Sequence, residues 1–113
     1  MDIKSLMHLQ QQFDEQHATA FEWGKQVSEE NMDVLKFLMI SLTGEVGEMA
    51  GIIKKILRGD FSLNSSLPAI SEECADIFAY LMKLCNQMNI DLEQAFLRKL
   101  EKNRSRFQKY EKQ

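Results

Sequence analysis

The stretch LTGEVGEMAGIIKK, residues 42–55, combines the apolar repeat of a helix with residues that an ordinary helix avoids. It holds three glycines, and glycine inside a helix costs roughly 1 kcal/mol relative to alanine. On a helical wheel centred on Leu38, Glu45 falls about 20° from the middle of the apolar face and Glu48 about 80° from it. A carboxylate aimed at a core requires a group that compensates its charge.

A second carboxylate pair stands on the helix expected around residues 68–88. With Ile70 at zero, Glu73 falls about 60° from the centre of the apolar face, and Asp76 falls about 120° away on the same side. Residues three apart are neighbours on one helical face. The sequence therefore predicts two acidic pairs, on two helices, that border or enter the core.

Four such carboxylates repel one another unless a cation neutralises them. An all-oxygen ligand set favours Mg²⁺, with Mn²⁺ as a substitute, over zinc. A di-iron bundle would use Glu-x-x-His pairs, and neither His8 nor His17 has that spacing. The competing interpretation is structural, with the carboxylates forming ion pairs to Lys or Arg of other helices.

The rest of the chain predicts an all-α, four-helix bundle-like fold in one domain, residues 1–113. The expected helices cover about 3–21, 31–57, 68–88 and 92–110. Asp2 and Asp91 are candidate N-caps, Gly59 is placed as a C-terminal glycine, and Pro68 suits a first turn after a loop with Ser65 and Ser66. The glycines of residues 44–51 predict a bend in the second helix and close approach of a helix or ligand.

Composition narrows the functional classes. The 113 residues are 44% apolar with a net charge of −3, enough for one core and without the basic footprint of a nucleic-acid binder. No apolar run reaches the length of a membrane span, and no signal-peptide pattern opens the chain, so a cytoplasmic location is expected. Cys74 and Cys85 lie about three turns apart, cannot bridge each other, and are expected to be buried and reduced.

Three segments together carry a family resemblance: GEVGEMAGIIKK, EECADIFAYLMKL and NIDLEQAFLRKLEKNRSRF. They resemble the MazG family of all-α nucleoside triphosphate pyrophosphohydrolases over residues 38–107. The family signature is E-x-x-E, a spacer and E-x-x-D, followed by a tyrosine four residues after the aspartate. In this chain these positions are Glu45, Glu48, Glu73, Asp76 and Tyr80.

The resemblance implies a Mg²⁺-dependent enzyme that cleaves a nucleoside triphosphate to the monophosphate and pyrophosphate. It also implies a MazG fold and an obligate dimer, able to pair into a tetramer, with sites at subunit interfaces. The expected substrate is a deoxynucleotide, with a pyrimidine such as dCTP favoured, and the expected role is house-cleaning of the nucleotide pool. The N-terminal third matches the family poorly.

The resemblance and the chemistry together assign roles to residues. The four signature carboxylates would hold metal, and one of them could instead act as the base toward water. The candidates for binding substrate are Lys55, Tyr80, Lys99, Asn103, Arg106 and Trp23. Lys54 competes with Lys55, which lies on the Glu48 side of the helix. Trp23 could simply be a packing residue, and Phe13 is expected in the core. A non-catalytic helical interaction module is the alternative to the enzyme.

Overall fold

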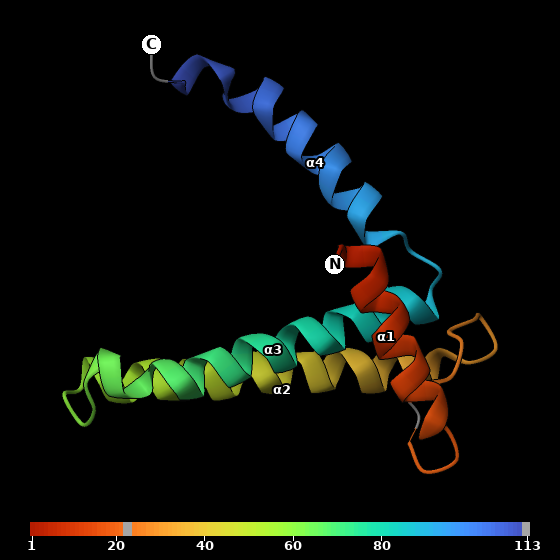
Figure 1. The fold of residues 1–113 in the computed structure, drawn as a ribbon, viewed down its shortest axis with the longest axis horizontal. Coiled ribbons are helices and arrows are strands. Elements are labelled where there is room, and N and C mark those ends of the chain that lie inside the picture. Colours follow the sequence, from red (N-terminus) through yellow and green to blue (C-terminus); the bar gives the residue numbers. More distant parts are fainter. Residues whose placement is uncertain (22–23, 112–113) are drawn as a thin grey trace.

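The computed structural model describes residues 1–21 and 24–111. The all-α class is confirmed, and the helices follow the predicted order (Figure 1). They are α1 (Ile3–Gln16), α2 (Met32–Leu57), α3 (Leu63–Gln87) and α4 (Leu92–Phe107), with a short 3₁₀ helix, η2 (Gln108–Tyr110), at the end.

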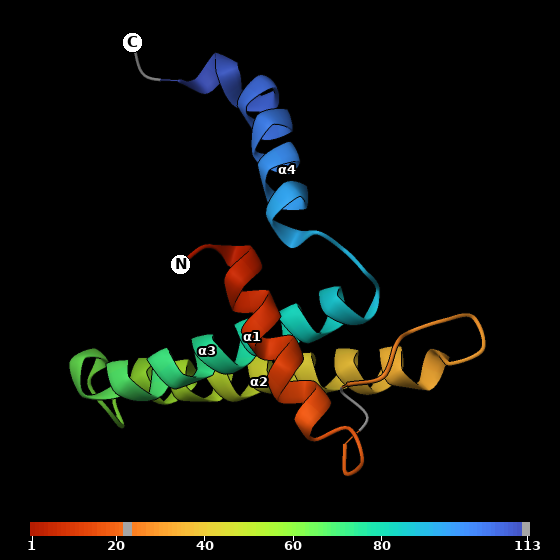
Figure 2. The same ribbon diagram turned by 45° about the vertical axis from the view of Figure 1, so that its right-hand side comes forward.

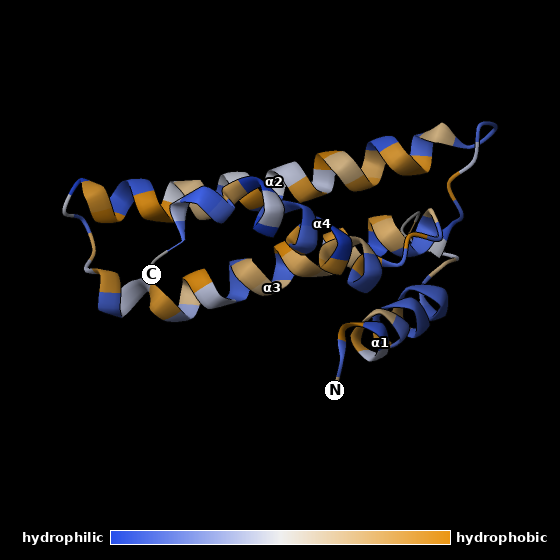
Figure 3. Ribbon diagram, turned by 90° about the horizontal axis from the view of Figure 1, so that it is seen from above, coloured by the Kyte–Doolittle hydropathy of each residue, from blue (hydrophilic) through white to orange (hydrophobic). Residues whose placement is uncertain are grey.

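The α2 and α3 helices form a long antiparallel hairpin and lie side by side (Figures 1 and 3). The α1 helix crosses this hairpin and packs against α3. The α4 helix contacts α1 and then extends away from the hairpin as an arm, which two views turned by 45° both show (Figures 1 and 2). The hairpin and α1 therefore form the packed part of the chain.

The core is small and divided into two clusters. One joins α1 to α3 through Met7, Met82 and Cys85. The other joins α2 to α3 and is built on Val34, Leu38 and Leu84, with partly buried side chains packed around them. Cys85 is buried as expected, whereas Cys74 is exposed, contrary to expectation.

Local capping explains several helix boundaries. Asp2 and Asp91 each accept the backbone N–H three residues on, at 2.8 and 3.1 Å, and both predicted N-caps are confirmed. Gly59 has φ +87°, and its N–H bonds to Ile56 while the next N–H bonds to Lys55, both at 3.0 Å. This pairing is a Schellman motif, which requires the left-handed backbone that glycine adopts readily.

The predicted start of the third helix is wrong by about one turn. The α3 helix begins at Leu63, because Ser62 caps it by accepting the N–H of Ser65 at 3.1 Å. Ser65 and Ser66 are thus helical, and Pro68 lies inside the helix instead of in its first turn. Pro68 has no N–H to donate, so α3 lacks one backbone hydrogen bond in its second turn.

Two further expectations require correction. The first helix ends at Gln16 instead of near Phe21, because the chain turns and Gly24 returns against its last turn. A Cβ at Gly24 would lie 2.9 Å from the Asp14 carbonyl oxygen, so this contact requires glycine. The irregularity expected at the α2 glycines is also not observed, since the helix runs continuously through residues 32–57.

The chain exposes more surface than a compact monomer of its size. Its accessible area is 8449 Å², whereas about 6,400 Å² is typical at 13.2 kDa. The radius of gyration is 17.4 Å, against about 13 Å expected for this length. Large apolar side chains remain exposed on the arm and on the hairpin, among other places. None of the described helices has the length and apolar character needed to cross a membrane.

Candidate functional site

The hairpin brings the two acidic pairs together. Glu45 and Glu48 belong to α2, while Glu73 and Asp76 belong to α3. One carboxylate oxygen from each of Glu45, Glu73 and Asp76 lies within 4.8 Å of the others. Glu48 is outside this group of three but close enough for its charge to act on Glu73. The predicted convergence of carboxylates from two helices is therefore present in the fold.

The environment of these groups is unfavourable for negative charge. Partial burial, then the adjacent carboxylates Glu45 and Glu48, raise the pKa of Glu73 to about 7. The Oε2 atoms of Glu45 and Glu73 are buried, and neither has a hydrogen-bond partner in the described residues. A buried acceptor without a partner is costly, so both oxygens point to an additional positive ligand.

A hard divalent cation fits this arrangement. Carboxylate oxygens on two facing helices are the ligands that Mg²⁺ and Mn²⁺ prefer, and a bound cation would satisfy both orphaned oxygens. The structural alternative, in which Lys or Arg pairs with these groups, is not observed among the described residues for three of the four carboxylates, whereas Asp76 is close enough to Lys83 for their charges to attract. Within residues 1–21 and 24–111, no ion pair is formed to Glu45, Glu48 or Glu73.

A cavity of about 520 Å³ opens beside the cluster, between α1 and the hairpin. Glu45 and Asp76 stand at its wall together with Tyr80 and Lys83 of α3. The α1 side of the cavity is mainly apolar and is formed by Leu6, Leu9 and Phe13. Gln10 is the polar residue on that side. The cavity therefore joins an acidic wall to an apolar one, and its volume is typical of small-molecule sites.

Lys83 is held in this cavity by an acidic residue of α1. Its Nζ lies 3.6 Å from Oδ1 of Asp14, and the two side chains are 6% and 0% exposed. Gln10 donates a hydrogen bond of 3.0 Å to the same Asp14 oxygen, and Lys83 Nζ also lies 4.6 Å from the centre of the Tyr80 ring. Burial is the main cause of both pKa shifts, raising that of Asp14 and lowering that of Lys83.

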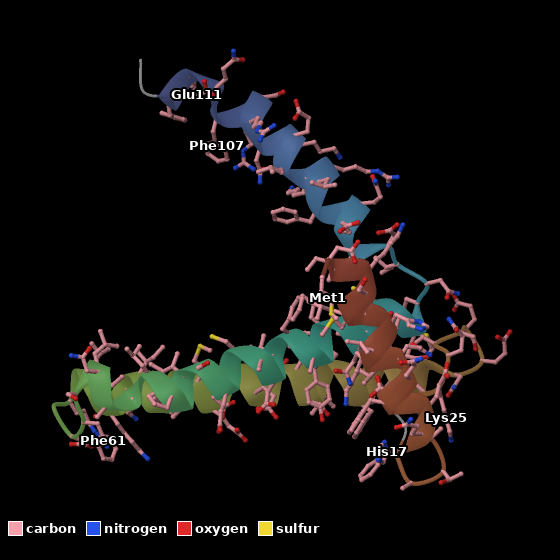
Figure 4. The ribbon with its side chains drawn as sticks, viewed as in Figure 1. Met1, His17, Lys25, Phe61, Phe107 and Glu111 are labelled. Carbon is pink, nitrogen blue, oxygen red and sulfur yellow. The ribbon has the colours of Figure 1, made fainter. Side chains whose placement is uncertain are left out.

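The other predicted substrate-binding residues are distributed unevenly. Tyr80 lines the cavity. Lys55 is exposed in the last turn of α2, at the end of the hairpin where Figure 4 labels Phe61. The remaining basic and polar candidates, Lys99, Asn103 and Arg106, lie on the arm. Figure 4 labels Phe107 at the far end of the arm. Trp23 lies outside the described residues.

Sequence reasoning misses three residues of the cavity. It does not single out Asp14 or Lys83, and it assigns Phe13 to the core although this side chain is 48% exposed at the cavity. One signal for Lys83 is present in the sequence. It lies seven residues after Asp76 and three after Tyr80, a spacing that places all three on one face of α3.

Comparison with known proteins identifies relatives for most of the chain. The family described as "MazG nucleotide pyrophosphohydrolase domain" matches residues 26–110. Human dCTP pyrophosphatase 1 is 34% identical over 74 residues, which are 62% of this chain and 44% of the human protein. The bovine protein of the same name is 35% identical over 74 residues, with the same coverage.

A phage protein is also similar over a larger share of its own length. The Gene 37 protein of Mycobacterium phage L5 is 30% identical over 79 residues, which cover 68% of this chain and 69% of the phage protein. The chain therefore spans less than half the length of its mammalian relatives and about two thirds of the phage relative. No solved structure matches it significantly.

Proposed function

We propose that this chain, which belongs to the MazG nucleotide pyrophosphohydrolase family, hydrolyses nucleoside triphosphates to monophosphates and pyrophosphate with Mg²⁺. The observation that carries the proposal is the three-carboxylate cluster, with its two buried and unpartnered oxygens, beside a cavity large enough for part of a nucleotide. Such a cluster would be destabilising without a cation, and the triphosphate is the natural source of anionic ligands for that cation.

Each carboxylate has a role in this proposal. Glu45, Glu73 and Asp76 would hold Mg²⁺, with Mn²⁺ as a substitute, and Glu48 would either complete the ligand set or accept a proton from the attacking water. When bound, the metal supplies neutralisation of phosphate charge and acidification of water. The protein's own contribution is to fix these oxygens on two packed helices, so that the phosphates and the water meet in a defined geometry.

The proposed substrate is a deoxynucleoside triphosphate with a pyrimidine base, dCTP being favoured. Two mammalian relatives are named for dCTP, and their similarity over 74 residues supports this choice. Tyr80 lines the cavity and would contact the base or sugar. The proposed biological role is removal of excess or modified deoxynucleotides from the pool.

We also propose that the active form is a homodimer, able to pair into a tetramer. The accessible surface exceeds that of a compact monomer by about 2,000 Å², an amount that obligate dimers bury. The arm exposes an apolar face formed by Phe96, Leu97, Leu100 and Phe107. A Cβ added to Gly44, Gly47 or Gly51 would meet nothing within 4 Å, so that side of α2 is open to a neighbour.

Dimerisation would also complete the site. Lys99, Asn103 and Arg106 stand on the arm, which extends away from its own chain's hairpin (Figure 1). In a dimer the arm of a second copy would bring these groups toward the phosphates, where positive charge is needed. Lys55 would add a further cation from the end of the hairpin.

The experiment that tests the activity measures pyrophosphate release from a panel of standard and modified NTPs and dNTPs, with Mg²⁺ and with EDTA. Release that requires Mg²⁺ and is confined to a few substrates supports the proposal. The variants Glu48→Gln and Glu73→Gln should abolish release, while Glu72→Gln, at an exposed neighbouring position, should retain it.

The alternative function is a non-catalytic, dimerising interaction module. It predicts no release from any nucleotide by a folded oligomer. It also predicts that Glu48→Gln either changes the stability of the protein or has no effect, because the protein would have no pyrophosphate release to lose. Among the described residues Glu45, Glu48 and Glu73 form no ion pair, which counts against this alternative, because a structural role would supply them with Lys or Arg partners.

A further inference from the structure

We propose that Lys83, fixed in the cavity wall by Asp14, is the residue that selects the base, by donating a hydrogen bond to a carbonyl oxygen on it. The inference rests on the proposed function, since it takes the cavity ligand to be a nucleotide. It assigns base selection to a pair of buried charges on α1 and α3 that the hydrolysis chemistry itself does not use.

The position of Lys83 along α3 sets its distance from the metal cluster. Asp76, Tyr80 and Lys83 stand on one face of the helix, and seven residues at 1.5 Å each separate the first from the last by about 10 Å. A nucleotide with its phosphates at Asp76 would extend past the Tyr80 ring and place its base near Lys83. All three residues line the same cavity.

The remaining wall is suited to a planar base. Leu6, Leu9 and Phe13 of α1 and Ala79 and Met82 of α3 line the cavity with apolar groups. Gln10 also lines it, but its amide donates to Asp14. In such surroundings one correctly placed donor discriminates strongly, because a base lacking the acceptor leaves that donor without its partner. Lys83 is the cationic donor in the cavity wall.

The contact with Asp14 makes Lys83 a defined donor and not a mobile one. Lysine normally has a long, flexible side chain, but here the side chain is 6% exposed and its Nζ lies 3.6 Å from Asp14 Oδ1. An ammonium group has three donors, so holding Asp14 is compatible with contacting a ligand. Gln10 in turn orients Asp14 through its 3.0 Å hydrogen bond.

The expected selectivity follows from base chemistry. Cytosine, uracil, thymine and guanine all carry a carbonyl oxygen. Adenine accepts only through its ring nitrogens, and it carries an amino donor where guanine has its carbonyl oxygen. Lys83 should therefore favour the first four bases over adenine. A phosphate-binding lysine would make no such distinction, because every nucleotide has the same phosphates.

The test measures binding of dCMP and dAMP by calorimetry in the presence of Mg²⁺. Both monophosphates are products of the proposed reaction, so the test does not require hydrolysis. The wild type should prefer dCMP, and Lys83→Met should weaken dCMP about ten- to hundred-fold while changing dAMP little. The double variant Asp14→Asn with Lys83→Met should behave in the same way, and it removes both charges without leaving one buried alone. Thermal unfolding identifies which variant is folded at the assay temperature.

Three results would overturn the inference. They are equal weakening of both monophosphates, no change in either one, and failure of the wild type to bind either one. Absence of pyrophosphate release together with Lys83-dependent preference for dCMP would overturn the proposed function and leave base selection by Lys83 standing. Mg²⁺-dependent release of pyrophosphate, combined with equally weakened binding of dCMP and dAMP in the Lys83 variant, would support the proposed function and overturn base selection by Lys83.

Discussion

Lys83 on α3 and Asp14 on α1 form a buried ion pair, with Nζ and Oδ1 separated by 3.6 Å. The pair lies where α1 crosses the hairpin, next to the core cluster of Met7, Met82 and Cys85. Burial opposes both charges, as the raised pKa of Asp14 and the lowered pKa of Lys83 indicate. Each charge is therefore tolerated largely because the other is present.

Removing one member of this pair should cost more stability than removing both. Lys83→Met leaves the Asp14 carboxylate buried without its cation, and we expect the free energy of unfolding at pH 7 to fall by about 3 kcal/mol or more. Adding Asp14→Asn to that variant should recover a large part of the loss. Urea unfolding of the three proteins checks this, and a single variant as stable as the double would contradict it.

The metal-free protein should lose stability as pH rises between about 4.5 and 7. The pKa of Glu73 is raised from 4.5 to about 7 in the fold, so in this window the native state holds more protons than the unfolded state. Stability therefore falls with rising pH across the window. Glu73→Gln should flatten this part of a pH series of unfolding midpoints, while Glu72→Gln should leave it unchanged.

The apolar face of the arm should control oligomeric state. Leu100→Asp places a charge in the middle of that face, and we expect the protein to become monomeric in sedimentation experiments. Lys102→Asp is the matched control, since it lies about 160° around the same helix and should leave the oligomer intact. A dimer that persists in Leu100→Asp would place the interface elsewhere.

Mixing two inactive variants should restore activity if the arm acts on the partner's site. We expect Glu73→Gln, which lacks a cluster ligand, and the double variant Lys99→Ala with Arg106→Ala each to lose most of their pyrophosphate release. A mixed dimer contains one site in which the intact cluster meets the intact arm. After co-refolding of equal amounts, random pairing should return about one quarter of wild-type activity per site. No recovery from a proven mixed dimer would indicate that each arm serves its own chain.

Much of this fold follows from short-range chemistry that a sequence displays. Asp2 and Asp91 cap helices through atoms three residues away, and Gly59 ends α2 through a backbone conformation that few other residues adopt. The start of α3 is mispredicted, although it too is set by a side-chain cap three residues from the N–H that it accepts. Ser62 and Ser65 are both competent caps, and Pro68 is compatible with a helix beginning after either one, so local signals alone do not decide.

The cluster and the cavity differ in how far they can be predicted. The carboxylates converge because each pair lies on one face of its own helix, which periodicity shows, and because α2 and α3 are joined as a hairpin. Lys83 lies about 140° from the centre of the apolar face of α3, where a helical wheel predicts exposure. Lys83 is buried because α1 crosses that side of α3. The crossing depends on tertiary packing, which a helical wheel of α3 alone does not describe.

The outward direction of α4 has a consequence for how the protein responds to its own abundance. A 16-residue helix that packs on α1 and α3 only near its start is only marginally stable on its own in water. The folding of α4 would then be coupled to association of two chains by mass action. Any contribution of its basic residues to substrate binding would depend on that association. Specific activity should consequently rise with protein concentration, and dilution alone should inactivate the protein.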